Sequence, residues 1–320
     1  MPPVTVDPVA PFFIVLNAGS GKDDATRTRT LIEGLFTEAG RPFQLQVVDE
    51  PSRLADIARV AVEQAQKRGG VVVAAGGDGT INAVAQAAHA SGCPFGVLPQ
   101  GTFNYFSRAH AIPADTAEAT RLLLSARAHP VQVGLVNDRL FLVNASLGMY
   151  PQLLEDREAA KQQFGRSRPV ALAAALVTLL RQHRQLRLHI ESDGQARDMR
   201  TPTLFVGNNA LQLEQFGFSD APVVAAGQLV AVAPRPVGTL SMVGLLVRGA
   251  LGRLGDADNV TSFAFRHISV TPASRRRGRP VKVATDGEVV WLTAPIAFRV
   301  ASEPLYLLKP DPVVKPEPAG

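Results

Sequence analysis

Residues 71–80, VVVAAGGDGT, decide the fold of the first part of this 320-residue chain. Five residues suited to a buried strand run into a turn of three glycines and one carboxylate, and helical sequence follows from Thr80 to about residue 90. Such a turn forms an anion site, because glycine lets a phosphate approach the backbone and the helix N-terminus offers N–H groups. Asp78 suits a metal-bound phosphate or a proton transfer. An ordinary strand-to-helix turn is the alternative, since Asp and Gly are common in turns.

Two familiar phosphate-binding motifs do not fit this part of the chain. A Walker A loop around the Gly-Lys pair at 21–22 needs Gly and Ser or Thr where Leu16 and Asp23 stand. A dinucleotide-binding fingerprint that starts at Gly77 needs its third glycine where Asn82 stands. The glycine turn is therefore neither a P-loop nor a dinucleotide-binding loop.

The first 130 residues alternate between apolar strands and helices. Strands are expected at 12–16, 43–48, 71–75 and 95–98, and helices end near residues 39, 68, 90 and 125. This alternation predicts a doubly wound, parallel α/β sheet. Ligands of such sheets bind at the carboxyl ends of the strands, so the loops at 17–22, 76–80 and 99–104 should converge.

The pattern changes to short strands and turns after about residue 130, which predicts an antiparallel β-sandwich. The predicted domains are an α/β nucleotide-binding domain at 9–130, to which residues 303–310 return, and a β-sandwich domain at 131–302. The proline-rich end, 311–320, is expected to be disordered. Sandwich strands are expected at 131–136, 139–146, 186–192, 201–208, 228–234, 262–271, 281–284 and 296–300, with helices near 152–182 and 238–253.

The chain is basic, with a net charge of +5 and a sequence pI of about 9.7, which suits an anionic ligand or membrane surface. Part of the excess is the run RRRGR at 275–279, interpreted first as an exposed hairpin tip and second as a lipid-phosphate patch. No basic and aromatic residues interleave, so nucleic acid is not an expected partner.

The sequence predicts a cytoplasmic protein. A single cysteine, Cys93, excludes an internal disulfide and suits a reducing compartment. No signal peptide is evident. The apolar run at 170–180 is too short to span a bilayer and is expected to be a core helix. The six histidines are dispersed, without the spacing of a metal motif.

A second acidic motif, DGE at 286–288, reads on its own as a hairpin turn, because Asp-Gly is a strong turn signal. Together with the earlier motifs, however, it resembles the diacylglycerol kinase catalytic family, which includes sphingosine kinases and bacterial lipid kinases. The resemblance runs in the family's order over about residues 12–309. Its elements are NAGSGK at 17–22, GGDGT at 76–80, LPQGTFN at 98–104, NASLG at 144–148 and DGE at 286–288.

The resemblance implies an ATP-dependent kinase that uses Mg²⁺ to phosphorylate a hydroxyl of a diacylglycerol-like or sphingoid lipid, as a peripheral protein at a membrane surface. A homodimer is compatible with it. Asp286 matches the catalytic base, and Asp78 is the alternative for that role. Asp78 and Glu288 match positions that hold the metal-bound nucleotide. The other matched nucleotide-binding residues are Asn17, Gly77, Gly79, Thr80, Gly101, Thr102 and Asn104.

Two departures from the family pattern remove carboxylates. Many members have Asp directly after the Asn that Asn104 matches, and Tyr105 stands there in this chain. An Asp-Gly pair is common before the strand near residue 228, and Ala226 replaces its Asp. Two other functions therefore stay open. NAD kinases share the Gly-Gly-Asp-Gly loop, although their Asn-Glu pair is absent here. A non-catalytic relative that binds lipid or nucleotide is the third reading, which the lost carboxylates favour and the retained Asp78, Asp286 and Glu288 oppose.

Overall fold

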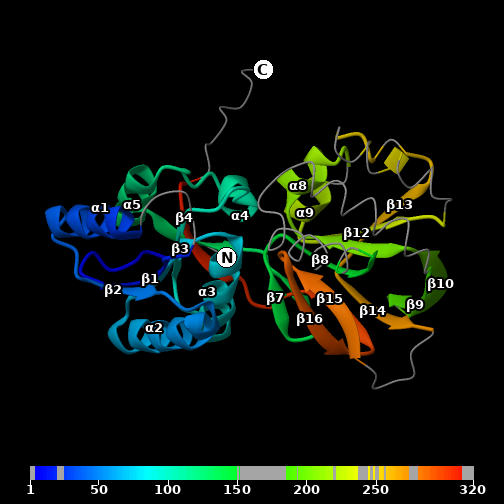
Figure 1. Cartoon of the computed structure of the whole chain (residues 1–320), viewed down its shortest axis with the longest axis horizontal. Helices are drawn as coiled ribbons and strands as arrows, with labels where there is room; N and C mark the ends of the chain where they lie inside the picture. Colours follow the sequence, from blue (N-terminus) through cyan, green and yellow to red (C-terminus); the bar gives the residue numbers. More distant parts are fainter. Residues whose placement is uncertain are drawn as a thin grey trace, which may run out of the picture. The chain divides into compact units, whose positions relative to one another are not determined.

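The computed structural model of the protein divides into two compact units. The first comprises residues 1–131 and 303–320, and the second comprises residues 132–302 (Figure 1). The residues that the structure describes are 4–19, 25–149, 151, 185–192, 194–218, 221–236, 244–245, 248, 252–255, 257–273 and 280–311.

The first unit is built on a six-stranded sheet with the strand order β2-β1-β3-β4-β18-β5. Its first five strands in this order pair in parallel, and β5 pairs antiparallel with β18. Every residue of β3 is buried, as expected for a central strand covered on both faces. The strands are β1 (Phe12–Asn17), β2 (Phe43–Val48), β3 (Val71–Gly76), β4 (Phe95–Pro99), β5 (Arg127–Val131) and β18 (Leu305–Lys309).

Helices cover both faces of this sheet, which confirms the predicted doubly wound α/β architecture. Figure 1 shows α1 and α5 on one side of the strands and α2 and α3 on the other, and each pair packs together. The helices are α1 (Ala25–Glu38), η1 (Pro51–Arg53), α2 (Leu54–Arg68), α3 (Asp78–Ser91), α4 (Tyr105–Ala109) and α5 (Thr116–Ser125).

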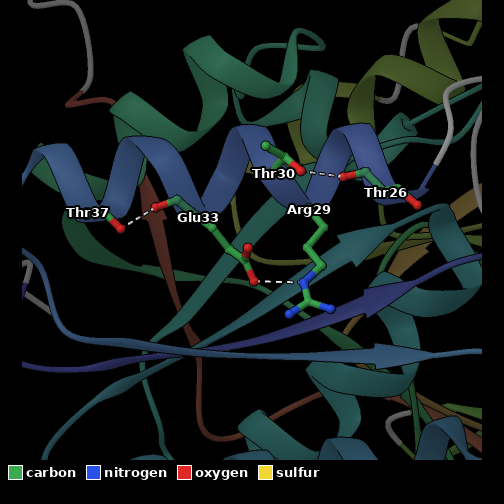
Figure 2. Close-up of polar contacts among 5 residues, drawn as sticks. All are labelled: Thr26, Arg29, Thr30, Glu33 and Thr37. Atoms are coloured by element: carbon green, nitrogen blue, oxygen red, sulfur yellow. Dashed lines mark hydrogen bonds and ion pairs between the residues drawn. The ribbon is translucent and has the colours of Figure 1, made fainter.

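The exposed face of α1 is held by polar contacts one turn apart (Figure 2). Arg29 Nε lies 2.7 Å from Glu33 Oε1, and the Thr30 hydroxyl donates to the Thr26 carbonyl at 3.0 Å. The Thr37 hydroxyl likewise donates to the Glu33 carbonyl at 2.7 Å. Such i,i+4 contacts add only a few tenths of a kcal/mol each, so α1 is stabilised mainly by its buried residues Ile32 and Phe36.

The second unit contains two six-stranded antiparallel sheets, as predicted. Their orders are β10-β9-β14-β17-β6-β7 and β13-β12-β11-β8-β15-β16. Alternate residues of both sheets form one apolar core, for example Ile190 and Phe298 from the first sheet and Leu147 and Val283 from the second.

The elements of the second unit follow in chain order. They are β6 (Gly134–Val136), β7 (Arg139–Phe141), β8 (Asn144–Gly148), β9 (Leu186–Ser192), β10 (Gln195–Thr201), β11 (Thr203–Gly207), α8 (Ala210–Gln215), α9 (Ala221–Ala225), β12 (Leu229–Pro234), β13 (Val260–Phe265), β14 (His267–Pro272), β15 (Pro280–Thr285), β16 (Glu288–Thr293) and β17 (Ile296–Val300).

Several predicted strands are wrong in extent. The run at 262–271 is two strands, because the chain passes from one sheet to the other at Arg266. The run at 139–146 breaks between β7 and β8, and the run at 131–136 contains the end of β5 and all of β6. β10, β16, α4, α8 and α9 were not predicted, and α3 begins at Asp78 instead of Thr80. At this change of sheet the core-facing positions shift from odd to even, with Phe265 before and Ile268 after two exposed residues, a break in the alternation that the prediction overlooked.

Some predictions fall outside the described residues. These are the helix near 152–182 with its apolar run at 170–180, the arginine run at 275–279, the end of the chain after residue 311, most of the helix at 238–253, and the glycine-lysine part of the loop at 17–22. Among the helices in the described ranges, none combines the length and apolar character needed to cross a membrane.

Candidate active site

The glycine turn lies at the carboxyl end of β3. Gly77 is extended (φ −81°, ψ 179°) and caps α3, which begins at Asp78, and the Ile81 N–H donates to the Gly77 carbonyl. Gly79 is in the first turn of the helix. The N-cap residue Gly77 has no side chain to cap this N-terminus, and a carboxylate stands in the first turn of the helix.

The loops after β3 and β4 approach each other at backbone distance. A Cβ built on Gly101 would lie 2.7 Å from Asn104 Oδ1 and 3.1 Å from the Gly77 Cα. A Cβ on Gly76 would lie 2.6 Å from the Thr80 side chain. Glycine is therefore required at Gly76 and Gly101 by close packing, even though neither residue has a positive φ.

Hydrogen bonds join all three strand-end loops, as their common edge predicts. Asn17 Nδ2, at the end of β1, donates to Thr80 Oγ1 at 2.8 Å. The Gln100 N–H, just after β4, donates to the Gly76 carbonyl at 2.8 Å. Thr102 follows Gly101 in the same loop and is exposed. The convergence of the described parts of these loops is thus confirmed.

Asp78 is half-buried between these loops. Its carboxylate accepts hydrogen bonds from the backbone N–H groups of Asn104 and Tyr105, which lower its pKa. Burial is the larger effect, so the pKa of Asp78 is raised above its ordinary value. Within the described residues, Asp78 Oδ1 and Asn104 Oδ1 are buried acceptors without a donor. A cation or a proton donor would satisfy both atoms.

Asp286 lies in the two-residue turn between β15 and β16. Asp286 and Gly287 both have positive φ (47° and 90°), as the Asp-Gly turn signal predicts. The carboxylate accepts three backbone N–H groups: Leu142 at 2.7 Å, and Val143 and Asn144 at 2.9 Å. The Asp286 N–H in turn donates to the Asn144 carbonyl. Asp286 therefore ties its hairpin to the segment that connects β7 and β8.

Glu288 begins β16 and is exposed. Its Oε2 lies 3.3 Å from Arg139 Nη2, an exposed ion pair that contributes little stability. Asp78 belongs to the first unit, whereas Asp286 and Glu288 belong to the second. In the described ranges, no three His, Cys, Asp or Glu side chains gather into a ready metal cluster.

A buried polar cluster in the second unit was not predicted as a site. Asn144 Nδ2 donates to Gln212 Oε1 at 3.0 Å, and Asn208 Nδ2 donates to the Leu142 carbonyl at 3.0 Å. Asn144 Oδ1 and Ser146 Oγ are buried without a hydrogen-bond partner among the described residues. The signal in the sequence is that the alternate positions 144 and 146 are polar inside an otherwise apolar strand.

The two positions that lack the family carboxylate differ in their surroundings. Tyr105 stacks on Phe103 with ring centres 5.9 Å apart and an interplanar angle of 4°, and the Arg108 guanidinium lies 6.0 Å from the Tyr105 ring. Tyr105 therefore contributes an aromatic contact, and its backbone N–H contacts Asp78. Ala226 lies in the turn between α9 and β12.

Comparison with known proteins confirms the family resemblance. Residues 11–136 match the model of the diacylglycerol kinase catalytic domain. A protein of Cronobacter sakazakii named as a YegS-like lipid kinase is 34% identical over 42% of this chain and 45% of its own length. A diacylglycerol kinase of Staphylococcus haemolyticus is 31% identical over 57% of this chain and 54% of its own length. The alignments thus span about half of each of these relatives.

The fold extends further than these alignments. The crystal structure of a diacylglycerol kinase from Bacillus anthracis covers 94% of this chain and 97% of its own, with a TM-score of 0.65 and 17% sequence identity. At this identity the similarity concerns the fold alone.

Proposed function

Because residues 11–136 match the model of the diacylglycerol kinase catalytic domain, we propose that this chain transfers the γ-phosphate of ATP to a hydroxyl of a diacylglycerol-like or sphingoid lipid. The observation that carries the proposal is the meeting of three strand-end loops at the N-terminus of α3, which has a glycine as its N-cap and Asp78 in its first turn. Phosphoryl transfer needs little covalent chemistry from the protein and depends on holding phosphates and stabilising their charge.

The nucleotide would be held mainly by backbone groups. Gly77 and Gly79 lie at the N-terminus of α3, which attracts the phosphate charge, and Gly101 lets the loop after β4 pack closely against Gly77. Polar side chains of the same loops would supply further contacts to the nucleotide. These are Asn17, Thr80, Thr102 and Asn104.

The residues fit a divalent cation on the phosphate side. Asp78 Oδ1 and Asn104 Oδ1 are buried oxygen acceptors that lack a donor in the described part of the chain, and oxygen is the ligand that Mg²⁺ prefers. In the first unit, Asp78 is the residue proposed to hold the metal-bound nucleotide, and Glu288 of the second unit stays a prediction from the family resemblance. When bound, Mg²⁺ neutralises charge on the transferring phosphoryl group.

Asp78 has two alternative roles, as a ligand of the cation or as the proton acceptor, and its surroundings favour it over Asp286 for the second role. Burial raises the pKa of Asp78, which brings a carboxylate closer to the range of a useful base. Asp286 instead accepts three backbone N–H groups, which occupy both of its carboxylate oxygens. We therefore assign Asp286 a positioning role: it fixes the segment that leads into Asn144 and the buried polar cluster.

The test is incubation with γ-labelled ATP, Mg²⁺ and a mixed lipid extract, followed by chromatography of the organic phase. We expect a labelled lipid from the native chain and none from Asp78→Asn. A separate assay for NADP formation from NAD tests the NAD kinase alternative. Label in NADP only would overturn the lipid acceptor, and no product in either assay would favour the non-catalytic relative.

A further inference from the structure

The hairpin that turns at Asp286 also carries the only tryptophan of the chain. Trp291 lies in β16 and is 58% exposed, although indole is among the costliest side chains to leave in water. Its neighbours Val290 and Leu292 pack against the core of the second unit. Because successive side chains of a strand point to opposite faces, Trp291 projects from the outer face of the sheet.

A cation accompanies the exposed indole. Lys282 in β15 is the cross-strand partner of Trp291, and its Nζ lies 5.1 Å from the ring centre. The ammonium group is attracted to the ring face, which keeps the two side chains together on the outer face. An indole beside a cation suits the boundary between lipid headgroups and acyl chains, where rings are partly buried and basic groups meet lipid phosphates.

The pair lies at the end of the strand order of its sheet, as far as the structure describes it. β16 ends the strand order of its sheet, so β15 is its only paired neighbour among the described strands. In the sequence, the basic run at 275–279 directly precedes Pro280, the first residue of β15. The chain as a whole carries a net charge of +5. These charges complement an anionic surface and oppose the approach of a second copy of the same basic chain.

We propose that the outer face of the β15–β16 hairpin docks on an anionic lipid surface, with Trp291 inserted at the interface and Lys282 against the lipid phosphates. This inference rests on the proposed lipid kinase function and adds where the membrane is met. It places the docking surface on the same hairpin as Asp286 and Glu288, the acidic motif of the second unit.

The single tryptophan makes the test specific to this site. Intrinsic emission of the native chain is recorded with phosphatidylcholine vesicles that contain or lack phosphatidylglycerol, both with brominated acyl chains. We expect quenching with the anionic vesicles, and its loss at high salt. Vesicle binding measured by co-sedimentation without quenching of Trp291 would overturn the proposal, as would absence of binding to anionic vesicles.

Matched variants separate docking from catalysis. Lys282→Gln should weaken partitioning of the protein into anionic vesicles about fivefold, and Trp291→Ala should weaken it about tenfold or more. Val60→Ala, at another exposed apolar side chain, should have no effect.

With lipid presented in neutral detergent micelles, Trp291→Ala should keep native turnover. If the native chain is inactive with lipid both in vesicles and in micelles, the kinase function is refuted. The docking proposal is then tested separately, by the quenching of Trp291. The alternative occupant of this face is a second copy of the chain. It would be indicated if Trp291 emission changed with protein concentration in the absence of vesicles and if a dimer formed that Trp291→Ala abolishes.

Discussion

Asp286→Asn should destabilise the second unit even if no chemistry passes through this residue. An asparagine keeps one oxygen but turns an NH₂ group toward the loop, so at least one of the N–H groups of Leu142, Val143 and Asn144 loses its acceptor. A hydrogen bond to a charged group contributes about 1.5–3 kcal/mol. Because Asp286 is half-buried, water can replace part of this. We expect a loss of about 2 kcal/mol.

Urea unfolding followed by Trp291 emission measures this loss directly, since the only tryptophan lies in the same hairpin. With a slope of about 1–3 kcal/mol per molar urea, the midpoint should fall by roughly 1 M. Glu288→Gln is the matched control. It removes a charge two residues away, but its exposed ion pair with Arg139 contributes at most about 1 kcal/mol.

Turnover separates the two roles of Asp286 when it is measured under conditions in which every variant is folded. If Asp286 is a positioning residue, Asp286→Asn should lower turnover less than Asp78→Asn does and should also raise the KM for the lipid. If Asp286 is the base, Asp286→Asn should lower kcat alone. The reasoning is refuted if Asp286→Asn unfolds at the same urea concentration as Glu288→Gln. It is equally refuted if the folded variant loses all turnover with the KM for lipid unchanged.

Three further predictions concern the first unit. Asp78→Asn should lower turnover at least about 100-fold at saturating Mg²⁺, because it removes the charge at the phosphate loop, and near-normal turnover would contradict this role. The same variant should be more stable than the native chain at pH 7, measured by urea unfolding with circular dichroism. Burial raises the pKa of Asp78 in the folded protein above its ordinary 3.8. The stability contribution of Asp78 is therefore present below pH 3.8 and is lost as the pH rises through the folded-state pKa. An equal midpoint for both proteins at pH 7 would argue against the buried carboxylate. Gly101→Ala should raise the KM for ATP and cost about 1–3 kcal/mol in stability, because its Cβ would approach the Gly77 backbone to 3.1 Å, while Gly34→Ala, where a Cβ meets no atom, should leave KM unchanged. Equal KM values for the two variants would refute the packing argument.

The sequence alone determined the parts of this protein that depend on neighbouring residues. The run from Val71 to Thr80 predicts its strand, its glycine turn and its helix, because strand period, glycine geometry and helix termini act over a few residues. The α/β architecture followed from repetition of that pattern, and the second domain of antiparallel sheets from the change to short strands. The Asp-Gly turn at 286–287 was visible for the same local reason.

Only the tertiary structure decided where these elements meet. The chain changes sheets at Arg266, and Phe265 and Ile268 enter one core from different sheets; the shift in alternation between them does not determine which strands each will pair with. The three N–H donors of Asp286 come from residues 142–144, far away in the sequence, and the packing of β15 against β8 brings them together. The same pairing turns Asn144 and Ser146 into buried polar groups, and Trp291 is exposed in β16, the last strand in the order of the described sheet. Such contacts depend on which strands become neighbours, and that is a property of the whole core, whereas each motif depends on its own short segment.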